Sequence, residues 1–129
     1  MKVYVYFNLH KRCFSVKALE GQAKGLVIAY ANDVVLFDPV FKVSKAGRER
    51  VLRERKKNVH AGVVGDWDPA QYKPARTVEL WATGGREVTY NPYKYEQFVY
   101  KNTGTPVDNQ PRYAGLHSDG QRATMWALK

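Results

Sequence analysis

The fold class depends first on the stretch Val3-Tyr4-Val5-Tyr6-Phe7, close to the start of the chain. Its residues alternate, so Val3, Val5 and Phe7 would share one face of a β-strand and the two tyrosines would share the other. Both faces carry side chains that suit a core or an interface. The stretch therefore predicts a central strand of a β-sheet.

Other short apolar runs extend this strand-rich pattern. The range Cys13–Leu19 follows a polar turn and predicts an N-terminal hairpin with the first strand. A second hairpin is predicted across Asn32-Asp33, between Leu26–Ala31 and Val34–Phe37. Further strands are predicted over Val40–Val43, Val59–Val64, Thr77–Ala82, Glu87–Tyr90, Gln97–Lys101 and Gln121–Leu128, the last after a hairpin turn at Asp119-Gly120.

One helix is predicted, over Ser44–Lys57. Ser44 suits the N-cap position and Asn58 suits the C-terminal stop. Gly47 in the first turn weakens this helix, because glycine costs about 1 kcal/mol relative to alanine inside a helix. With one helix among the strands, no parallel βαβ pattern is present. We therefore expect a single domain, residues 1–129, of the α+β class: a mainly antiparallel β-sheet or curled barrel with one packed basic helix.

The chain is strongly basic, and this bears on its partner. Its 129 residues include 21 Lys and Arg against 12 Asp and Glu, a net charge of +9. Nucleic acids, nucleotides and acidic membranes are all anionic partners that such a charge suits, and solubility alone is the alternative. No stretch approaches the ~20 apolar residues of a membrane span. The single cysteine, Cys13, cannot form an internal disulfide, so a cytoplasmic location is expected.

The charge is concentrated in the range Lys42–Lys57, where eight basic and two acidic residues give +6 of the total +9. On a helical projection Arg50, Arg53 and Lys57 fall on the solvent side. Arg48 and Arg55 instead project toward the apolar stripe that should meet the sheet. These two arginines therefore need an anion or a route to water.

Three explanations are open for this inward pair. The arginine stems can pack while the heads reach solvent, or the guanidinium groups can pair with a carboxylate such as Glu79 or Glu87. The functional hypothesis is a phosphate clamp between helix and sheet, formed by Arg48 and Arg55, because the planar guanidinium suits phosphate.

Four other residues are candidates for ligand contacts. His60 lies in the small-residue segment 58–65 and could donate to a phosphate, although a bond to a neighbouring carbonyl is the more common arrangement for a lone histidine. Asn91 and Tyr93 belong to a tyrosine-rich stretch in which Asn91 could read a base edge and Tyr93 could stack on a base. The alternative is an aromatic cluster that seals the sheet. Arg112 follows a polar stretch and could supply a further guanidinium.

Motifs for catalysis are absent. The sequence has no HExxH, no paired CxxC and no P-loop, and no nucleophile–base pair stands out. We therefore expect no catalytic residue, metal ligand or cofactor, and the sequence favours a non-enzymatic protein without excluding an enzyme. A metal-dependent nuclease would have to use Asp66 and Asp68 as its metal ligands. The support for it is weak, because the two residues lack a third acidic ligand.

Three segments resemble small tailed-phage proteins of uncharacterised activity: 5–11 (VYFNLHK), 47–62 (GRERVLRERKKNVHAG) and 88–93 (VTYNPY). The resemblance covers roughly residues 1–100, and the last thirty residues look individual. In size and general character the chain is also similar to the phage anti-Thoeris sponges, which are small strand-rich oligomers that sequester cyclic nucleotide signals. That similarity implies a homo-oligomer in the host cytoplasm.

The sequence thus leads to three functional hypotheses. The first is non-enzymatic binding of a phosphate-bearing, nucleotide-type small molecule by Arg48, Arg55, His60, Asn91, Tyr93 and Arg112. The second is a nucleic-acid-binding phage accessory protein that uses the outward helix residues. The third is the metal-dependent nuclease. They differ in which arginines they require.

Overall fold

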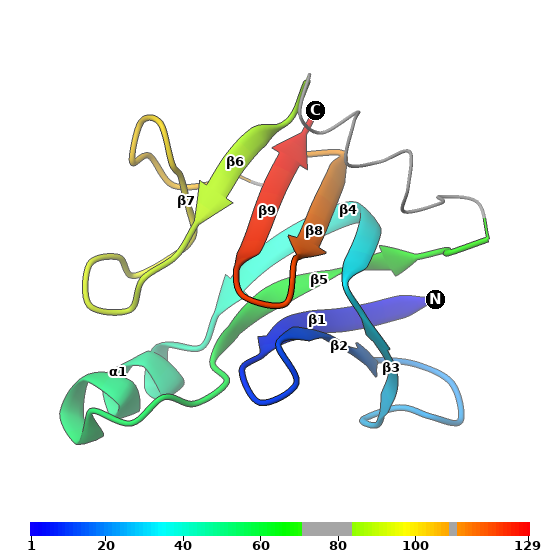
Figure 1. Cartoon of the computed structure of the whole chain (residues 1–129), viewed down its shortest axis with the longest axis horizontal. Coiled ribbons are helices and arrows are strands. Elements are labelled where there is room, and N and C mark those ends of the chain that lie inside the picture. The colour runs from blue at the N-terminus through cyan, green and yellow to red at the C-terminus, as the bar shows by residue number, and fades with distance from the viewer. Residues whose placement is uncertain (71–83, 109–110) are drawn as a thin grey trace.

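The computed structural model describes residues 1–70, 84–108 and 111–129 and contains an antiparallel sheet with one helix (Figure 1). Within these ranges the sheet has nine strands in the order β3-β2-β1-β5-β4-β8-β9-β6-β7. The mainly antiparallel α+β fold is therefore confirmed. The strands are β1 (Lys2–Asn8), β2 (Cys13–Ala18), β3 (Val27–Ala31), β4 (Asp33–Val43), β5 (Ala61–Trp67), β6 (Arg86–Thr89), β7 (Val99–Tyr100), β8 (Tyr113–Ser118) and β9 (Ala123–Leu128).

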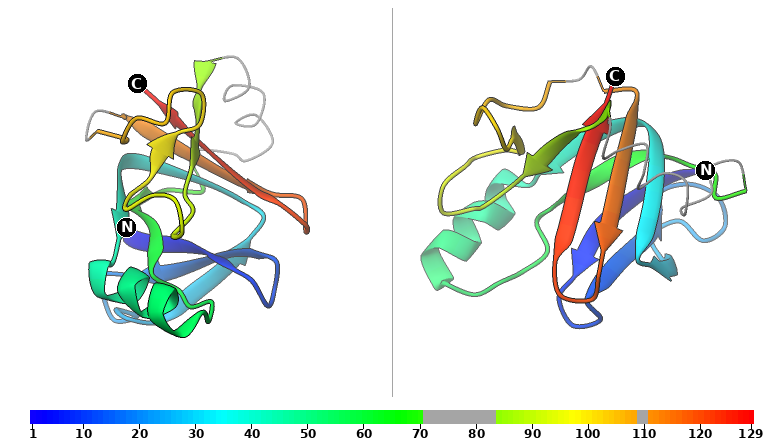
Figure 2. Two further views of the ribbon diagram at one scale, coloured as in Figure 1. Left: turned by 90° about the vertical axis from the view of Figure 1, so that its left-hand side faces the viewer. Right: turned by 45° about the horizontal axis from the view of Figure 1, so that its top comes forward.

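The sheet is curved, but it does not close. Strands β3 and β7 form the two ends of the strand order among the described residues, so the curled-barrel alternative is wrong. The two halves of the sheet instead turn toward one another, with β8 and β9 on one side and β1 and β2 on the other (Figure 2). Twist accumulates across so many strands and bends an open sheet in this way.

Strand β1 is central, as its alternation predicts. It pairs with β2, where Val5 lies opposite Val16, and with β5, where Val5 lies opposite Val63. Val3 and Val5 are fully buried, whereas Tyr4 and Tyr6 are half-buried on the other face. The N-terminal hairpin of β1 and β2 is likewise confirmed.

The second predicted hairpin is wrong. Strand β3 pairs with β2, whereas β4 lies between β5 and β8. Val34, Val35 and Leu36 are all buried, so both faces of β4 need cover that a central position supplies. Ile28 and Tyr30 of β3 are exposed, which suits an edge strand. The chain bends at Asn32 without reversing, so β3 and β4 run in the same direction along the sheet and form no hairpin.

Strand β4 is one element where two were predicted. Its pairing with β5 shifts register between Phe37 and Val40. Asp38 has a positive φ of 49°, and Pro39 carries no N–H to donate. A bulge at this dipeptide keeps the strand continuous and bends it.

The C-terminal half departs further from expectation. Strand β8 was not predicted, because its buried residues Ala114 and Gly115 are too small to show clear alternation. The hairpin turn at Asp119-Gly120 is confirmed and joins β8 to β9. The predicted strand Thr77–Ala82 lies outside the described residues.

Helix α1 (Lys45–Glu54) begins as predicted, with the Ser44 Oγ accepting a hydrogen bond from the Gly47 N–H. It ends three residues before the predicted Lys57, because Arg55 adopts the left-handed conformation at the C-cap. Val51 is its one buried residue. The helix therefore stands at the end of the sheet, between β4 and β5, rather than across a face (Figure 1).

The hydrophobic core fills the concave side of the curved sheet. Its main cluster draws on β1, β2, β4, β5 and β8, and a smaller cluster of Val88, Phe98, Tyr100 and Ala127 lies beneath β6, β7 and β9. Phe41 and Met125 contact both clusters. No helix in the described part of the chain is long and apolar enough to cross a membrane.

Candidate functional site

A cleft of about 740 Å³ opens where the two halves of the sheet meet α1. Its inner wall is apolar and includes Phe7, Phe98 and Met125. Most of its polar side chains come from two short segments, the connection from α1 to β5 and the turn after β6. These are Lys57, Asn58, His60, Tyr90, Asn91 and Tyr93, and β1 adds Tyr6 and Asn8. An apolar cavity with a few converging polar groups is the usual form of a small-molecule site.

His60 lies in this wall with both ring nitrogens occupied. Nδ1 is 3.1 Å from the carbonyl oxygen of Asn58, and Nε2 is 2.7 Å from the hydroxyl of Tyr90. A carbonyl oxygen only accepts, so Nδ1 is the donor in the first bond, and in that tautomer Nε2 accepts from the Tyr90 hydroxyl. The carbonyl partner that was the alternative for His60 is therefore present, together with a second partner, Tyr90, from the segment that follows β6.

Tyr90 connects the polar edge of the cleft to its apolar wall. Its ring contacts His60 at 5.4 Å between centroids and Phe98 at 5.2 Å. Burial raises the pKa of the Tyr90 hydroxyl, and the nearby positive charge of Arg48 partly opposes that rise. Tyr90 thus stays a neutral hydrogen-bond donor at physiological pH.

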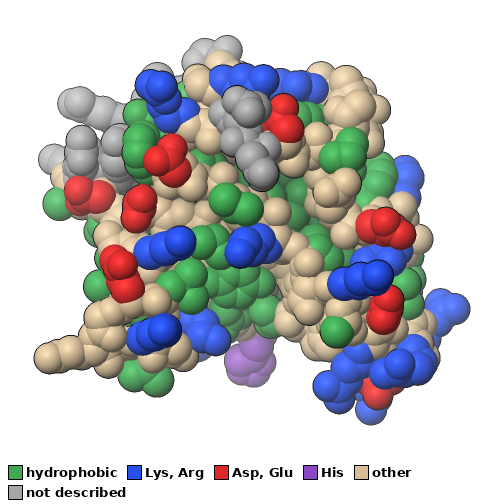
Figure 3. All heavy atoms as spheres, turned by 180° about the vertical axis from the view of Figure 1, so that it is seen from behind, with side chains coloured by type: hydrophobic (Ala, Val, Ile, Leu, Met, Phe, Trp, Pro, Cys, Tyr) green, Lys and Arg blue, Asp and Glu red, His purple; other side chains and the backbone are tan. Residues whose placement is uncertain are grey.

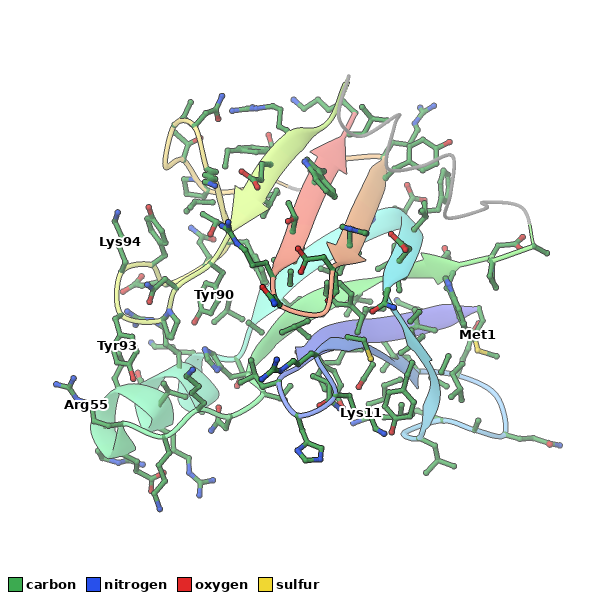
Figure 4. All side chains as sticks on the ribbon, in the orientation of Figure 1. Met1, Lys11, Arg55, Tyr90, Tyr93 and Lys94 are labelled. Atoms are coloured by element: carbon green, nitrogen blue, oxygen red, sulfur yellow. The ribbon has the colours of Figure 1, made fainter. Side chains whose placement is uncertain are left out.

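Asn91 and Tyr93 lie together at the mouth of the cleft. The Asn91 Oδ1 accepts a hydrogen bond from the Tyr93 N–H at 2.9 Å, which shapes the turn. The Tyr93 side chain is 54% exposed, and the Arg55 guanidinium lies 5.9 Å from its ring centroid. Figure 4 shows Tyr93 in the turn after β6, beside Arg55 at the end of α1.

The predicted inward pair divides. Arg48 is half-buried, and its Nε donates to the carbonyl oxygens of Pro92 and Tyr95, each at 3.0 Å. Arg55 is exposed, and its inward projection is wrong because the helix ends at Glu54. Arg48 therefore fastens α1 to the turn through backbone carbonyls, a partner that neither alternative foresaw.

The remaining sequence candidates lie elsewhere. The exposed Arg112 precedes β8, and its backbone pairs with Asp38 and Leu128, away from α1. Glu87, a suggested partner for the arginines, pairs with Lys101 at 3.1 Å. Glu79 lies outside the described residues. The structure thus brings His60, Asn91 and Tyr93 to the cleft, with Arg55 at its rim, and leaves Arg112 apart.

Sequence reasoning missed the apolar wall and one cation. Phe7 and Phe98 line the cleft, and the alternation of the first strand already put Phe7 on the core side. Lys57, expected on the solvent side of a longer helix, lines the cleft because the chain turns at Arg55. In the described ranges, no group of three or more His, Cys, Asp or Glu side chains could hold a metal ion, and Asp66 and Asp68 are both exposed.

The sequence of the chain matches a family of phage proteins. The family described as the Mycobacterium phage L5 gene 82 protein matches residues 1–123. The chain belongs to this family. A curated relative, the gene 82 protein of Mycobacterium phage L5, is 41% identical over an alignment of 129 residues. The alignment covers 95% of each chain. No solved structure matches the chain.

Membership in this family confirms the resemblance to small phage proteins and extends it. The match continues well past residue 100, so the last thirty residues are mostly part of the family rather than individual. Strand β8 lies within the matched range, which ends at Ala123, the first residue of β9.

Proposed function

We propose that the protein binds a phosphate-bearing, nucleotide-type small molecule in the cleft without chemical conversion, as a phage counter-defence protein that sequesters a cyclic nucleotide signal. The observation that carries this proposal is an apolar cleft of about 740 Å³ with cationic side chains at its mouth. The volume falls within the range of about 300–1,000 Å³ that is common for ligand pockets.

The lining suits the two parts of such a ligand. A planar base would contact Phe7, Phe98 and the ring of Tyr90 inside the cleft. The phosphate would stay at the mouth, where Lys57 lines the cleft and Arg55 lies beside Tyr93. Keeping the charge near water avoids the large cost of burying an unpaired ion.

A homo-oligomer belongs to the same proposal, and the sheet edge supports it. Among the described residues, strand β3 pairs with one strand, β2, and Leu26, Ile28 and Tyr30 on or beside β3 are exposed. An exposed apolar edge strand readily pairs with a second chain. Light scattering should report an oligomer for the unmodified protein and a smaller species for Ile28→Lys. A monomer at all concentrations would contradict this part.

Native mass spectrometry of the purified protein tests the ligand directly, because it reports co-purified small molecules and oligomeric state together. Calorimetric titration with cyclic mono- and dinucleotides follows. We expect Tyr93→Ala and Lys57→Gln each to weaken binding about tenfold. Arg112→Gln, which removes a charge outside the cleft, is the matched control. Equal losses in all three variants, or no binding, would refute cleft binding.

The outward face of α1 supports a second candidate, nucleic-acid binding. Lysine and arginine side chains gather over this helix (lower right in Figure 3). Part of this charge is compensated, because Arg50 pairs with Glu54 at 2.8 Å. Binding here would weaken steeply with salt and would be lost in Arg50→Gln/Arg53→Gln. Retention in that double variant would exclude the helix as the main contact.

A further inference from the structure

A second hollow lies on the opposite face of the sheet from the core. It has a volume of about 580 Å³, and its lining comes from β1, β2, β3, β4 and the segment that follows α1. Its side chains include Tyr4, Tyr6, Lys17, Lys42 and Val27. Neither the cleft proposal nor the family membership assigns a role to this face.

The strand register places these residues on one face of the sheet, in a diagonal row. Lys17 lies opposite both Tyr4 and Val27. On β5, Tyr4 lies opposite Val64, two residues from Gly62, and Gly62 lies opposite Lys42. Residues that pair across strands, or that lie two apart along one strand, share a face. The row crosses β3, β2, β1, β5 and β4, which are neighbours in that order, and shifts by two residues along β5.

The middle of the row is aromatic. The rings of Tyr4 and Tyr6 lie 5.8 Å apart, tilted by 36°. A Cβ atom at Gly62 would come within 2.6 Å of the Tyr4 ring and of the Val5 carbonyl oxygen. Gly62 thus lets both the Tyr4 ring and the backbone of Val5 approach β5 closely.

The two lysines bracket this aromatic surface. Within the described residues, neither Lys17 nor Lys42 forms a salt bridge, and no acidic side chain lines the hollow. Asp66 on the same face lies opposite Lys2, toward the other end of β1. Three strand spacings separate β2 from β4, roughly 14 Å, so one phosphate cannot contact both lysines. Two phosphates of one nucleic-acid strand can each contact one of the lysines.

We propose that this row is a binding surface for single-stranded nucleic acid, with bases stacked on Tyr4 and Tyr6 and backbone phosphates at Lys17 and Lys42. Aromatic rings beside cations are the usual means of holding unpaired strands without reading their sequence. A duplex fits less well, since its bases already stack on each other. The hollow shares Tyr6, Val59 and His60 with the lining of the cleft, whereas Tyr4, Lys17 and Lys42 line the hollow alone.

Fluorescence anisotropy with a labelled oligothymidylate of about twelve nucleotides tests this surface. We expect Lys17→Gln/Lys42→Gln to reduce the magnitude of the salt slope by about 1.4, because each single-strand phosphate contact contributes about 0.7. Tyr6→Leu should weaken binding about 5- to 150-fold, the range for one stacked base. A duplex of equal length and thymidine monophosphate should bind more weakly than the oligonucleotide.

Controls separate this surface from general attraction to a basic protein. Arg122→Gln/Lys129→Gln removes the same charge from β8–β9 and the C-terminus and should retain the tyrosine-dependent binding. Equal losses in this control, loss only in Arg50→Gln/Arg53→Gln, or no effect of Tyr6→Leu would each overturn the proposal. Circular dichroism checks that each variant folds. If a tyrosine variant does not fold, the substitutions at the exposed Lys42 and the half-buried Lys17 still test the proposal. Tyr93→Ala should leave oligonucleotide binding unchanged, so failure here is distinct from failure of cleft binding.

Discussion

The hydroxyl of Tyr90 lies 2.7 Å from Nε2 of His60 and joins the turn after β6 to the segment that enters β5. These residues are thirty positions apart in sequence, and their contact forms one wall of the cleft. Tyr90→Phe would leave the half-buried Nε2 without its donor. We expect a loss of about 1–2 kcal/mol in the free energy of unfolding, measured by urea denaturation.

A matched control is Tyr93→Phe, which removes a hydroxyl from an exposed side chain. Its effect should stay within about 0.5 kcal/mol. If the two phenylalanine variants were equally stable, the Tyr90–His60 hydrogen bond would contribute nothing to folding.

Arg48 anchors α1 to the 92–95 turn through two backbone carbonyls. Lysine keeps the charge but has no Nε, so Arg48→Lys should lose both hydrogen bonds and cost about 1–2 kcal/mol of stability. Arg50→Lys is the control, since Arg50 is exposed and an exposed ion pair contributes little. A result in which Arg50→Lys costs more than Arg48→Lys would show that the turn is held by other contacts.

Gly47 gives a prediction opposite to helix propensity. In an open helix Gly→Ala stabilises by about 1 kcal/mol. At position 47 the added methyl would lie 2.6 Å from the His60 Cβ, which is closer than real Cβ contacts. We therefore expect Gly47→Ala to lower the melting temperature, whereas Glu49→Ala on the exposed side should leave it nearly unchanged. A melting temperature raised by Gly47→Ala would mean that α1 and His60 are farther apart.

Asp119 makes stability depend on pH. Its Oδ1 accepts backbone hydrogen bonds from Arg122 at 2.7 Å and Gln121 at 2.9 Å, and these bonds lower the pKa of the carboxyl below 3.8. A lowered folded-state pKa stabilises the fold above the unfolded value, and this contribution is lost as the pH falls through the folded value.

Asparagine at this position keeps the accepting oxygen and removes the titration. The stability advantage of the unmodified protein over Asp119→Asn should therefore be full above pH 3.8 and shrink below it, measured by denaturation at several pH values. A constant difference across this range would show that the carboxylate does not contribute through its charge.

Much of the first half of the fold followed from sequence. The alternation of Val3–Phe7 predicted the central strand, and Ser44 predicted where α1 begins. Both depend on local geometry, which neighbouring residues determine. Strand partners do not, and the Asn32-Asp33 turn led to the wrong hairpin because burial of β4, rather than turn chemistry, places that strand between β5 and β8.

The candidate site was also predicted only in part, because the sequence shows residue type and local context but not where the chain leaves its helix. His60, Asn91 and Tyr93 stood out by residue type and local context, and all three line the cleft. Arg48 and Arg55 were grouped by helical projection, which holds only while the helix lasts. The left-handed turn at Arg55 ended that geometry and turned Lys57 toward the cleft.

By itself, the sequence determined that this is a basic, strand-rich chain with an alternating first strand and one charged helix. These properties follow from composition and from periods of two and 3.6 residues, which short segments carry alone. Only the tertiary structure decided that Tyr90 meets His60, that Tyr4 lies over Gly62 between two lysines, and that the sheet stays open. Those relations join residues far apart in the chain, and burial of the shared core selects them from many pairings that local sequence allows equally well.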